Sequence, residues 1–449
     1  MEPTSKKESP TGRWQLFMGK ARNHFPEKLF LVVAAVVTGI ATGLAAVVFK
    51  WCIGHMAKLV QEGYHMAGNN AILLILPLIG FLGTAVILKF IIGKDIAHGV
   101  DKIVADLKEK SYRLPGYFVW GPVVTGTFTL GFGGSAGSEG PIATCGAGVG
   151  SRMAQLFGIT SDNTRLLLGC GSGAGIAAIF KAPVAGMLFA LEVLKLPVNT
   201  FITLLILLAC LIASLTCYIF TGFTFDLPLG TLAAFEPVHY IYTAVFGLFC
   251  GAYAIYYSAI MKQMGKAFAS VKSQWLKAIL GGIVVGVLLY VFPALYGEGY
   301  DVMGDILRGN LHAITKGSIL SGSNSITVVM ITAVGIAVVK SLAAGATTNG
   351  GVAGDFAPAL FAGCFAGLVF SGMLNTFCGT HLPVADFALI GMAGVMAGVV
   401  RAPLMSMFLA VEMTGNYIVF LPIVLCSAIS YCIVEYFGGK PVKTIEKIM

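Results

Sequence analysis

The strongest constraint on the fold is a series of long apolar runs that carry almost no charge. The first run extends from Leu29 to Phe49, and about 20 apolar residues are enough for a helix to cross a bilayer. Similar runs follow as far as Phe437. Only 11% of the residues are charged and 57% are hydrophobic, whereas an ordinary soluble domain has about 25% charged residues. We therefore expect an all-α polytopic membrane protein with the lipid bilayer as its solvent.

The basic residues are concentrated at the two ends of the chain and in a few loops. The net charge is +8, from 29 basic and 21 acidic residues. Lysine and arginine accumulate in the cytoplasmic segments of membrane proteins, so this excess needs no nucleic acid as a partner. We expect residues 1–28 to form a basic cytoplasmic segment and residues 29–449 a transmembrane domain. Both termini then lie in the cytoplasm, and the protein belongs in the plasma (inner) membrane.

The cysteines predict neither a disulfide framework nor a metal site. All 10 are scattered singly, without a C-x-x-C motif or a Cys/His cluster. We expect no metal, no organic cofactor and no enzymatic activity.

Glycine shapes the expected architecture. The chain has 57 glycines, and they cluster within the apolar runs, many of which are too short or too broken for simple spans. Small residues let membrane helices approach closely. Broken helices at membrane depth are tolerated where they are buried or line a wet cavity. These features favour many short, tilted and broken helices over a bundle of straight rods.

Two pairs of segments repeat in the same order and at nearly the same offset. They are Gly171–Val193 with Gly391–Met413, and Gly137–Pro141 with Gly354–Pro358. The chain is therefore predicted to contain two related halves, at about 30–225 and 235–440. In many transporters such halves are inverted, and the substrate site lies between them. Glu192 and Glu412 occupy matched positions in the first pair, which favours a structural role for both.

Glu139 is the most informative ionisable residue. Gly137 and Gly140 flank the pair Ser138-Glu139. Pro141 follows and marks the start of a helix. The backbone amides of Ser138, Glu139 and Gly140 then lie at a helix N-terminus, which attracts anions. A carboxylate at such a place competes with a bound anion. Glu139 is therefore predicted to be a gate that opens when its side chain is protonated or displaced.

The second repeat supplies an equivalent helix N-terminus. Pro358 follows the amides of Asp355 and Phe356, which form a second predicted anion site; the Asp355 side chain is expected to cap the helix. His98 precedes another helical stretch. It is either a loop residue or a pore-facing group whose protonation near neutral pH adds positive charge.

Seven short elements then suggest a family. They are GSEGP at Gly137, FKAPVAG at Phe180, GEGYD at Gly297, GDFAP at Gly354, RAPL at Arg401, EMTGNY at Glu412 and GGKP at Gly438. In this order they resemble motifs of the CLC family of chloride channels and anion/proton exchangers. The resemblance is to the prokaryotic type without C-terminal regulatory domains. It implies a homodimer with a separate pore in each subunit and two inverted halves.

The resemblance also implies roles for individual residues. Glu139 matches the external gating glutamate. The amides of Ser138, Glu139 and Gly140 match an outer anion site, and those of Asp355 and Phe356 a central one. Chloride is then the bound ligand.

Three departures from the family pattern affect the expected mechanism. His98 replaces a pore serine, and Lys443 stands where a tyrosine is usual. The inner anion site is therefore expected to be lined by His98 and Lys443. Val193 occupies the place of an inner glutamate that relays protons in coupled members, and valine cannot carry a proton.

The predicted function is transport of chloride or a similar monovalent anion through a pore gated by Glu139. Because of Val193, a channel-like pathway is favoured over the alternative, a chloride/proton antiporter in which Glu192 is a candidate proton relay. Acid pH is expected to raise the flux, by protonating both Glu139 and His98. Fluoride export stays open as a further alternative. An intramembrane hydrolase would need His98 beside Ser135, and no pattern in the sequence places them together.

Overall fold

The chain is α-helical in a computed structural model that describes residues 26–67, 71–93, 103, 112–159, 161–224, 227, 235–318 and 325–439. The α-helices up to residue 224 are α2 (Glu27–Ala67), α3 (Ile72–Val86), α5 (Gly121–Gly131), α6 (Glu139–Leu156), α7 (Ser161–Phe180), α8 (Pro183–Glu192) and α9 (Thr200–Thr221). Those that follow are α10 (Pro237–Ala269), α11 (Gln274–Val291), α12 (Tyr300–Leu307), α13 (Ile326–Gly350), α14 (Phe356–Cys378), α15 (Val384–Val400), α16 (Pro403–Thr414) and α17 (Phe420–Phe437). The short segments are a π-helix, η1 (Ile87–Ile92), and three 3-10 turns, η2 (Gly116–Val119), η3 (Pro293–Leu295) and η4 (Leu311–Thr315).

The helices are long enough for a protein that crosses the membrane several times. Within the described residues, eight helical segments have the length and composition of a membrane span: α2, α3 with η1, α9, α10, α11, α13, α14 and α17. Shorter apolar helices, α8, α15 and α16, lie among them. The chain is therefore an integral, multi-pass membrane protein, as its composition predicts.

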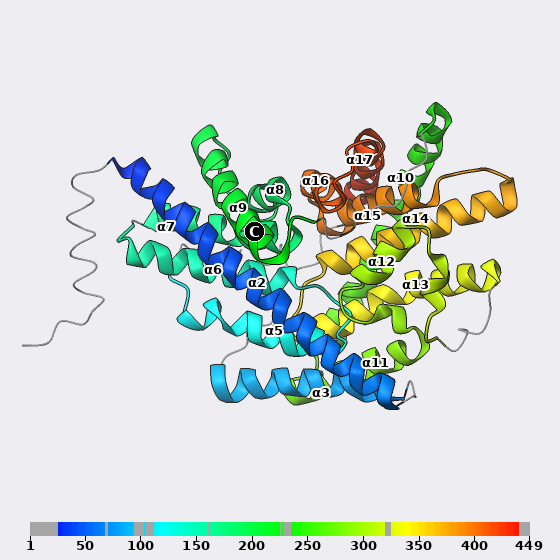
Figure 1. Cartoon of the computed structure of the whole chain (residues 1–449), viewed down its shortest axis with the longest axis horizontal. Helices are drawn as coiled ribbons and strands as arrows, with labels where there is room; N and C mark the ends of the chain where they lie inside the picture. The colour runs from blue at the N-terminus through cyan, green and yellow to red at the C-terminus, as the bar shows by residue number, and fades with distance from the viewer. Residues whose placement is uncertain are drawn as a thin grey trace, which may run out of the picture.

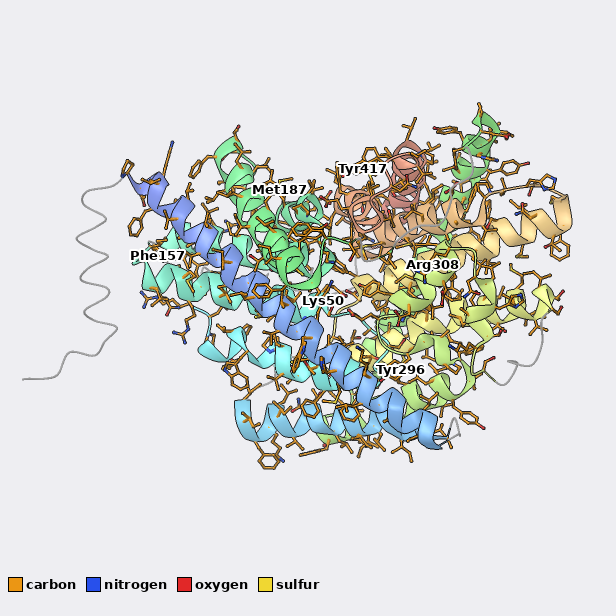
Figure 2. All side chains as sticks on the ribbon, viewed as in Figure 1. Lys50, Phe157, Met187, Tyr296, Arg308 and Tyr417 are labelled. Atoms are coloured by element: carbon orange, nitrogen blue, oxygen red, sulfur yellow. The ribbon has the colours of Figure 1, made fainter. Side chains whose placement is uncertain are left out.

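The two halves of the chain lie side by side. Figure 1 shows α6 to α9 on the left and α13 to α17 on the right, with α2 running diagonally across the front. Contacts also join the halves, and α3 packs along α11. At the lower centre, the Tyr296 hydroxyl donates a hydrogen bond of 2.7 Å to the carbonyl oxygen of Gly131 (Figure 2).

Equivalent helix pairs in the two halves pack through equivalent glycines. A Cβ atom added to Gly146 of α6 would overlap the carbonyl oxygen of Gly171 in α7. A Cβ added to Gly363 of α14 would likewise overlap the carbonyl oxygen of Gly391 in α15. These are the positions that align between the repeats. The clustered glycines therefore serve close helix crossing, as predicted.

A local two-fold axis relates the halves. Gly137 and Gly354, which are equivalent residues, pair in an antiparallel bridge with N–H···O distances of 3.0 and 2.8 Å. Two equivalent residues that exchange both bonds lie on a two-fold axis, and the chain runs through them in opposite directions. Lys181 and Arg401, also equivalent, share an unusual left-handed backbone with φ of 54° and 58°. The predicted all-α fold of two inverted halves is confirmed.

Candidate functional site

The site lies where the N-termini of α6 and α14 meet, beside the Gly137–Gly354 bridge. Both glycines of the bridge allow the close approach. A Cβ added to Gly137 or to Gly354 would overlap the Glu139 carboxylate. The two predicted anion-binding termini are thus brought together by the tertiary fold. Their partial positive charges face a shared space between the halves.

The Glu139 side chain crosses from one terminus to the other. Its Oε1 atom accepts a hydrogen bond of 2.6 Å from the backbone N–H of Phe356, the first residue of α14. The residue is 1% exposed, and Oε2 is buried without a hydrogen-bond partner among the described residues. A carboxylate on a helix N-terminal amide is chemically a tethered anion. The carboxylate accepts a bond from the Phe356 amide, which the sequence analysis assigned to a mobile anion.

Ser138 is also engaged by a carboxylate. Its backbone N–H and its hydroxyl both donate to Oε1 of Glu298, at 2.9 and 2.5 Å. Glu298 lies two residues before the first residue of α12 and belongs to the GEGYD element. Sequence reasoning quoted that element as a family motif but did not place its glutamate at the anion site. The charge-assisted bonds from one serine explain why the side chain is held there.

Lys340 is a fully buried lysine near these carboxylates. Its Nζ atom donates to the Ser135 hydroxyl at 2.9 Å and lies 4.4 Å from the centre of the Phe361 ring. The charges of Glu139 and Glu298 both act on it. Sequence reasoning missed Lys340, although it is the single charged residue among the 25 residues of α13. An ionisable group inside a membrane helix is a functional candidate by default.

One prediction for Asp355 is wrong. The residue stands at the N-cap position of α14, but its side chain makes no capping hydrogen bond to the helix. Asp355 instead contributes a negative charge that acts on Glu139. An N-cap side chain accepts from the backbone N–H of the second or third helix residue, and the third residue of α14 is Pro358, which has no N–H.

Two predicted site residues lie outside the described residues. His98 and Lys443 both fall in segments that the structure does not describe. Their expected place at the inner anion site stays a prediction.

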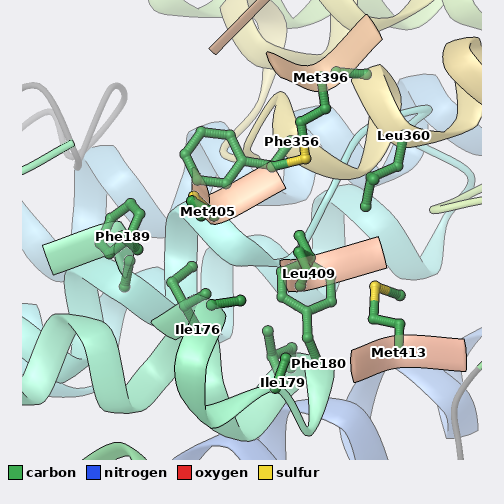
Figure 3. Packing of buried hydrophobic residues seen from close by; sticks show 14 of the residues in the cluster. Ile176, Ile179, Phe180, Phe189, Phe356, Leu360, Met396, Met405, Leu409 and Met413 are labelled. Carbon is green, nitrogen blue, oxygen red and sulfur yellow. The ribbon is translucent and has the colours of Figure 1, made fainter. Parts of the chain in front are cut away.

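Apolar side chains from both halves pack against the site (Figure 3). Phe356 is 7% exposed, and the rings of Phe356 and Phe189 meet edge to face with centroids 5.8 Å apart. Ile176 and Phe180 come from α7, whereas Met405, Leu409 and Met413 come from α16 (Figure 3). Low-dielectric walls of this kind strengthen the pull of the helix termini on an anion.

Glu192 and Glu412 make reciprocal contacts across the two-fold axis. Glu192 accepts bonds from the backbone N–H groups of Leu404 and Met405, at the start of α16. Glu412 accepts bonds from those of Val184 and Ala185, at the start of α8. Each carboxylate therefore satisfies the free amides of the other's helix. The geometry suits the structural role favoured by their matched positions.

Replacing Glu192 or Glu412 tests that role. If both carboxylates serve as helix caps, Glu192→Gln and Glu412→Gln should each lower the thermal unfolding temperature by a similar amount. Loss of a cap typically costs about 0.5–2 kcal/mol. Neither variant should selectively stop proton movement in reconstituted vesicles. A Glu192→Gln protein that keeps its stability and its anion flux but loses proton transport would instead identify Glu192 as the relay.

Val193 does not supply a proton-carrying group. It directly follows α8, is 8% exposed and contributes to the apolar core. A proton that reaches Glu139 from the opposite face therefore needs another carrier.

The hydrogen-bond partners of Ser135 and Ser138 bear on the hydrolase alternative. The Ser135 hydroxyl accepts a bond from Lys340, and its backbone N–H donates to the Thr347 hydroxyl at 3.0 Å. The Ser138 hydroxyl is bonded to Glu298. No histidine of the described chain contacts either serine hydroxyl.

Comparison with known proteins gives a consistent family assignment. The model of a family described as voltage gated chloride channel matches residues 79–435. An H(+)/Cl(-) exchange transporter, ClcA of Vibrio vulnificus strain YJ016, is 28% identical over 330 residues, or 71% of this chain. The chain covers 66% of that transporter, just under two thirds of its length.

Solved structures share the fold. A slow cyanobacterial Cl-/H+ antiporter superposes with a TM-score of 0.77 at 22% identity, covering 93% of this chain and 97% of the antiporter. A CLC-type fluoride/proton antiporter gives a TM-score of 0.72 at 21% identity, covering 91% and 95%. At these identities the likeness concerns the fold.

Proposed function

Because the chain belongs to the voltage gated chloride channel family, we propose that it is an anion/proton exchanger that moves chloride. The observation that carries this proposal is the Glu139 carboxylate on the Phe356 amide, 2.6 Å away. One group there can compete with an anion and also carry a proton. The name of the Vibrio relative supports coupled exchange over the channel-like pathway that Val193 favoured.

The proposed cycle follows from charge. When ionised, Glu139 fills the α14 terminus and excludes a mobile anion. When protonated it loses its charge and its hold on the amide, so an anion can take the place. The amides of Ser138 and Gly140 then serve as the outer site, and those of Asp355 and Phe356 as the central one. The ionised carboxylate and the anion thus occupy the α14 terminus alternately, and Glu139 takes up a proton each time it gives way to an anion, which links the two movements.

The proposed exchanger needs a proton path on the inner side of Glu139, which the channel-like alternative does not. Protons must pass Val193 on the way to Glu139, and a chain of water molecules is the proposed carrier. His98 and Lys443 are proposed to line the inner anion site, where positive charge strengthens binding but slows release. Protonation of His98 then adds to the rise in flux at acid pH.

We further propose a homodimer with both termini in the cytoplasm and a location in the plasma membrane. Large apolar side chains are exposed on α16, on α17 and on the loop between them: Leu404, Tyr417, Ile418 and Leu421 (Figure 2 labels Tyr417). Exposed apolar patches of this kind suit a second subunit or lipid. The resemblance to the family favours the subunit.

The test is reconstitution of the purified protein into liposomes under a chloride gradient. External chloride and pH are recorded together, with potassium and valinomycin setting the voltage. We expect chloride moving down its gradient to drive protons against theirs. Chloride flux without proton movement would establish a channel and overturn the coupled reading.

The same assay decides between anions. Replacing chloride with fluoride in the gradient should give slower proton movement if chloride is the substrate. Fast fluoride exchange with little chloride exchange would assign the protein to fluoride export instead.

A further inference from the structure

We propose that Glu298 is a second gating carboxylate, which competes with the transported anion for the N-terminus of α6. The inference rests on the proposed function and adds a second competitor, at the outer anion position. Glu139 competes at the central position, on α14.

The contact at Ser138 has the chemistry of an occupied anion site. Serine has one backbone N–H and one hydroxyl donor. Both donate to a single oxygen, Oε1 of Glu298, at 2.9 and 2.5 Å. While that oxygen is in place, Ser138 has no donor left for a mobile anion. An anion can use Ser138 only after the Glu298 carboxylate has left.

A specific backbone turn delivers the Glu298 side chain. The residue lies between Gly297 and Gly299, whose φ values are 63° and 81°. Left-handed conformations of this kind are readily adopted by glycine and strained in other residues. A Cβ on Gly299 would also overlap the Phe361 ring. The carboxylate is thus placed by a short, constrained segment.

The arrangement of Glu298 mirrors that of Glu139 between the two halves. Glu139 starts α6 in the first half and binds the amide of Phe356 in the second. Glu298 precedes α12 in the second half and binds the amide of Ser138 in the first. Each helix terminus at the site therefore holds a carboxylate from the opposite half. Two tethered anions occupy the two positions assigned to mobile ones.

The charges around the site make anion entry sensitive to the charge of Glu298. Lys340 on α13 is the cation on which both Glu139 and Glu298 act. Asp355, at the start of α14, adds a negative charge that acts on Glu139. Three carboxylates around one described lysine repel an entering anion. Removing the charge of Glu298 should therefore both free Ser138 and reduce this repulsion.

The binding test uses chloride itself as the probe. Isothermal titration of purified protein in detergent compares Glu139→Gln with the double variant Glu139→Gln/Glu298→Gln. If Glu298 fills its site nine-tenths of the time, its removal tightens the apparent chloride affinity about tenfold. Asp301→Asn in the Glu139→Gln background is the matched control. It loses one carboxylate three residues away, where the side chain is exposed, and should leave the affinity unchanged.

The flux test uses the liposome assay. Glu298→Gln alone should lower the chloride concentration for half-maximal flux several-fold and keep proton coupling, because Glu139 is intact. Glu298→Asp, whose shorter side chain falls short of Ser138, should act in the same direction and guards against a folding artefact of one variant. Unchanged chloride affinity and half-saturation in both variants would overturn the proposal. A wild-type protein that moves neither ion would instead overturn the proposed function, and titration would still report on Glu298.

Discussion

Glu139→Gln is expected to abolish proton movement, while chloride flux persists and loses most of its dependence on pH. Glutamine is nearly the same size as glutamate, but it carries no charge and no transferable proton. The Phe356 amide that now bonds to Oε1 of Glu139, at 2.6 Å, becomes available to a mobile anion. The carboxylate that excluded the anion at neutral pH is then absent at every pH.

The measurement is the recording of chloride and proton movement in the liposome assay between about pH 4.5 and 7.5, where carboxylates and histidine change charge. Wild-type flux should rise toward acid pH, because protonation of Glu139 opens the central site. Any pH dependence that persists in the variant is assigned to Glu298 and His98, and the Glu139→Gln/Glu298→Gln protein separates the two. The matched control is Glu435→Gln, since Glu435 is 56% exposed and pairs with Arg401 at the surface. Proton pumping by the Glu139→Gln protein would rule out Glu139 as the coupling group.

The second large effect is expected from adding one methyl group at a helix crossing. A Cβ on Gly150 of α6 would overlap the carbonyl oxygen of Leu167 in α7. Both helices are buried there, and the obstructing atom belongs to the backbone, so neither partner can turn away. Overpacking of this kind costs about 1–3 kcal/mol or more. Gly150→Ala should therefore lower the thermal unfolding temperature sharply or leave little folded protein.

The chain contains its own control for this prediction. Gly265 on α10 has no atom within 4 Å of an added Cβ. Alanine is a better helix former than glycine by about 1 kcal/mol, so Gly265→Ala should be neutral or slightly stabilising. Size-exclusion profiles and thermal unfolding in detergent measure both variants. Equal stability of the two proteins would mean that the α6–α7 crossing adapts more readily than its geometry indicates.

Much of the site could be predicted because its chemistry is local in the sequence. Helix N-termini are encoded by short Gly- and Pro-containing segments, so the amino-acid pattern was enough to place Ser138, Glu139 and Phe356 at the starts of two helices. The repeat was readable for a similar reason. Equivalent glycines such as Gly146 and Gly363 are required wherever two helix backbones touch, and this requirement leaves a pattern in the chain.

Other features depend on contacts between distant segments, and no local pattern reveals which residues are partners. Glu298 reaches Ser138 across 160 positions of sequence, and Lys340 reaches Ser135 across 205. The Phe356 amide at the start of α14 bonds to Glu139, which is 217 residues away in the sequence. Competition between polar partners for one amide is decided in three dimensions.

The amino-acid sequence by itself determined that this chain is a membrane protein, that it contains two related halves and where the helix N-termini of the predicted anion site begin. Those properties follow from hydrophobicity and from backbone conformation, which each residue and its neighbours carry with them. The tertiary structure alone decided which side chain fills each terminus, because hydrogen bonds and charge pairs depend on distance in space. It placed two carboxylates, Glu139 and Glu298, on the two predicted anion-binding termini and buried Lys340 near them.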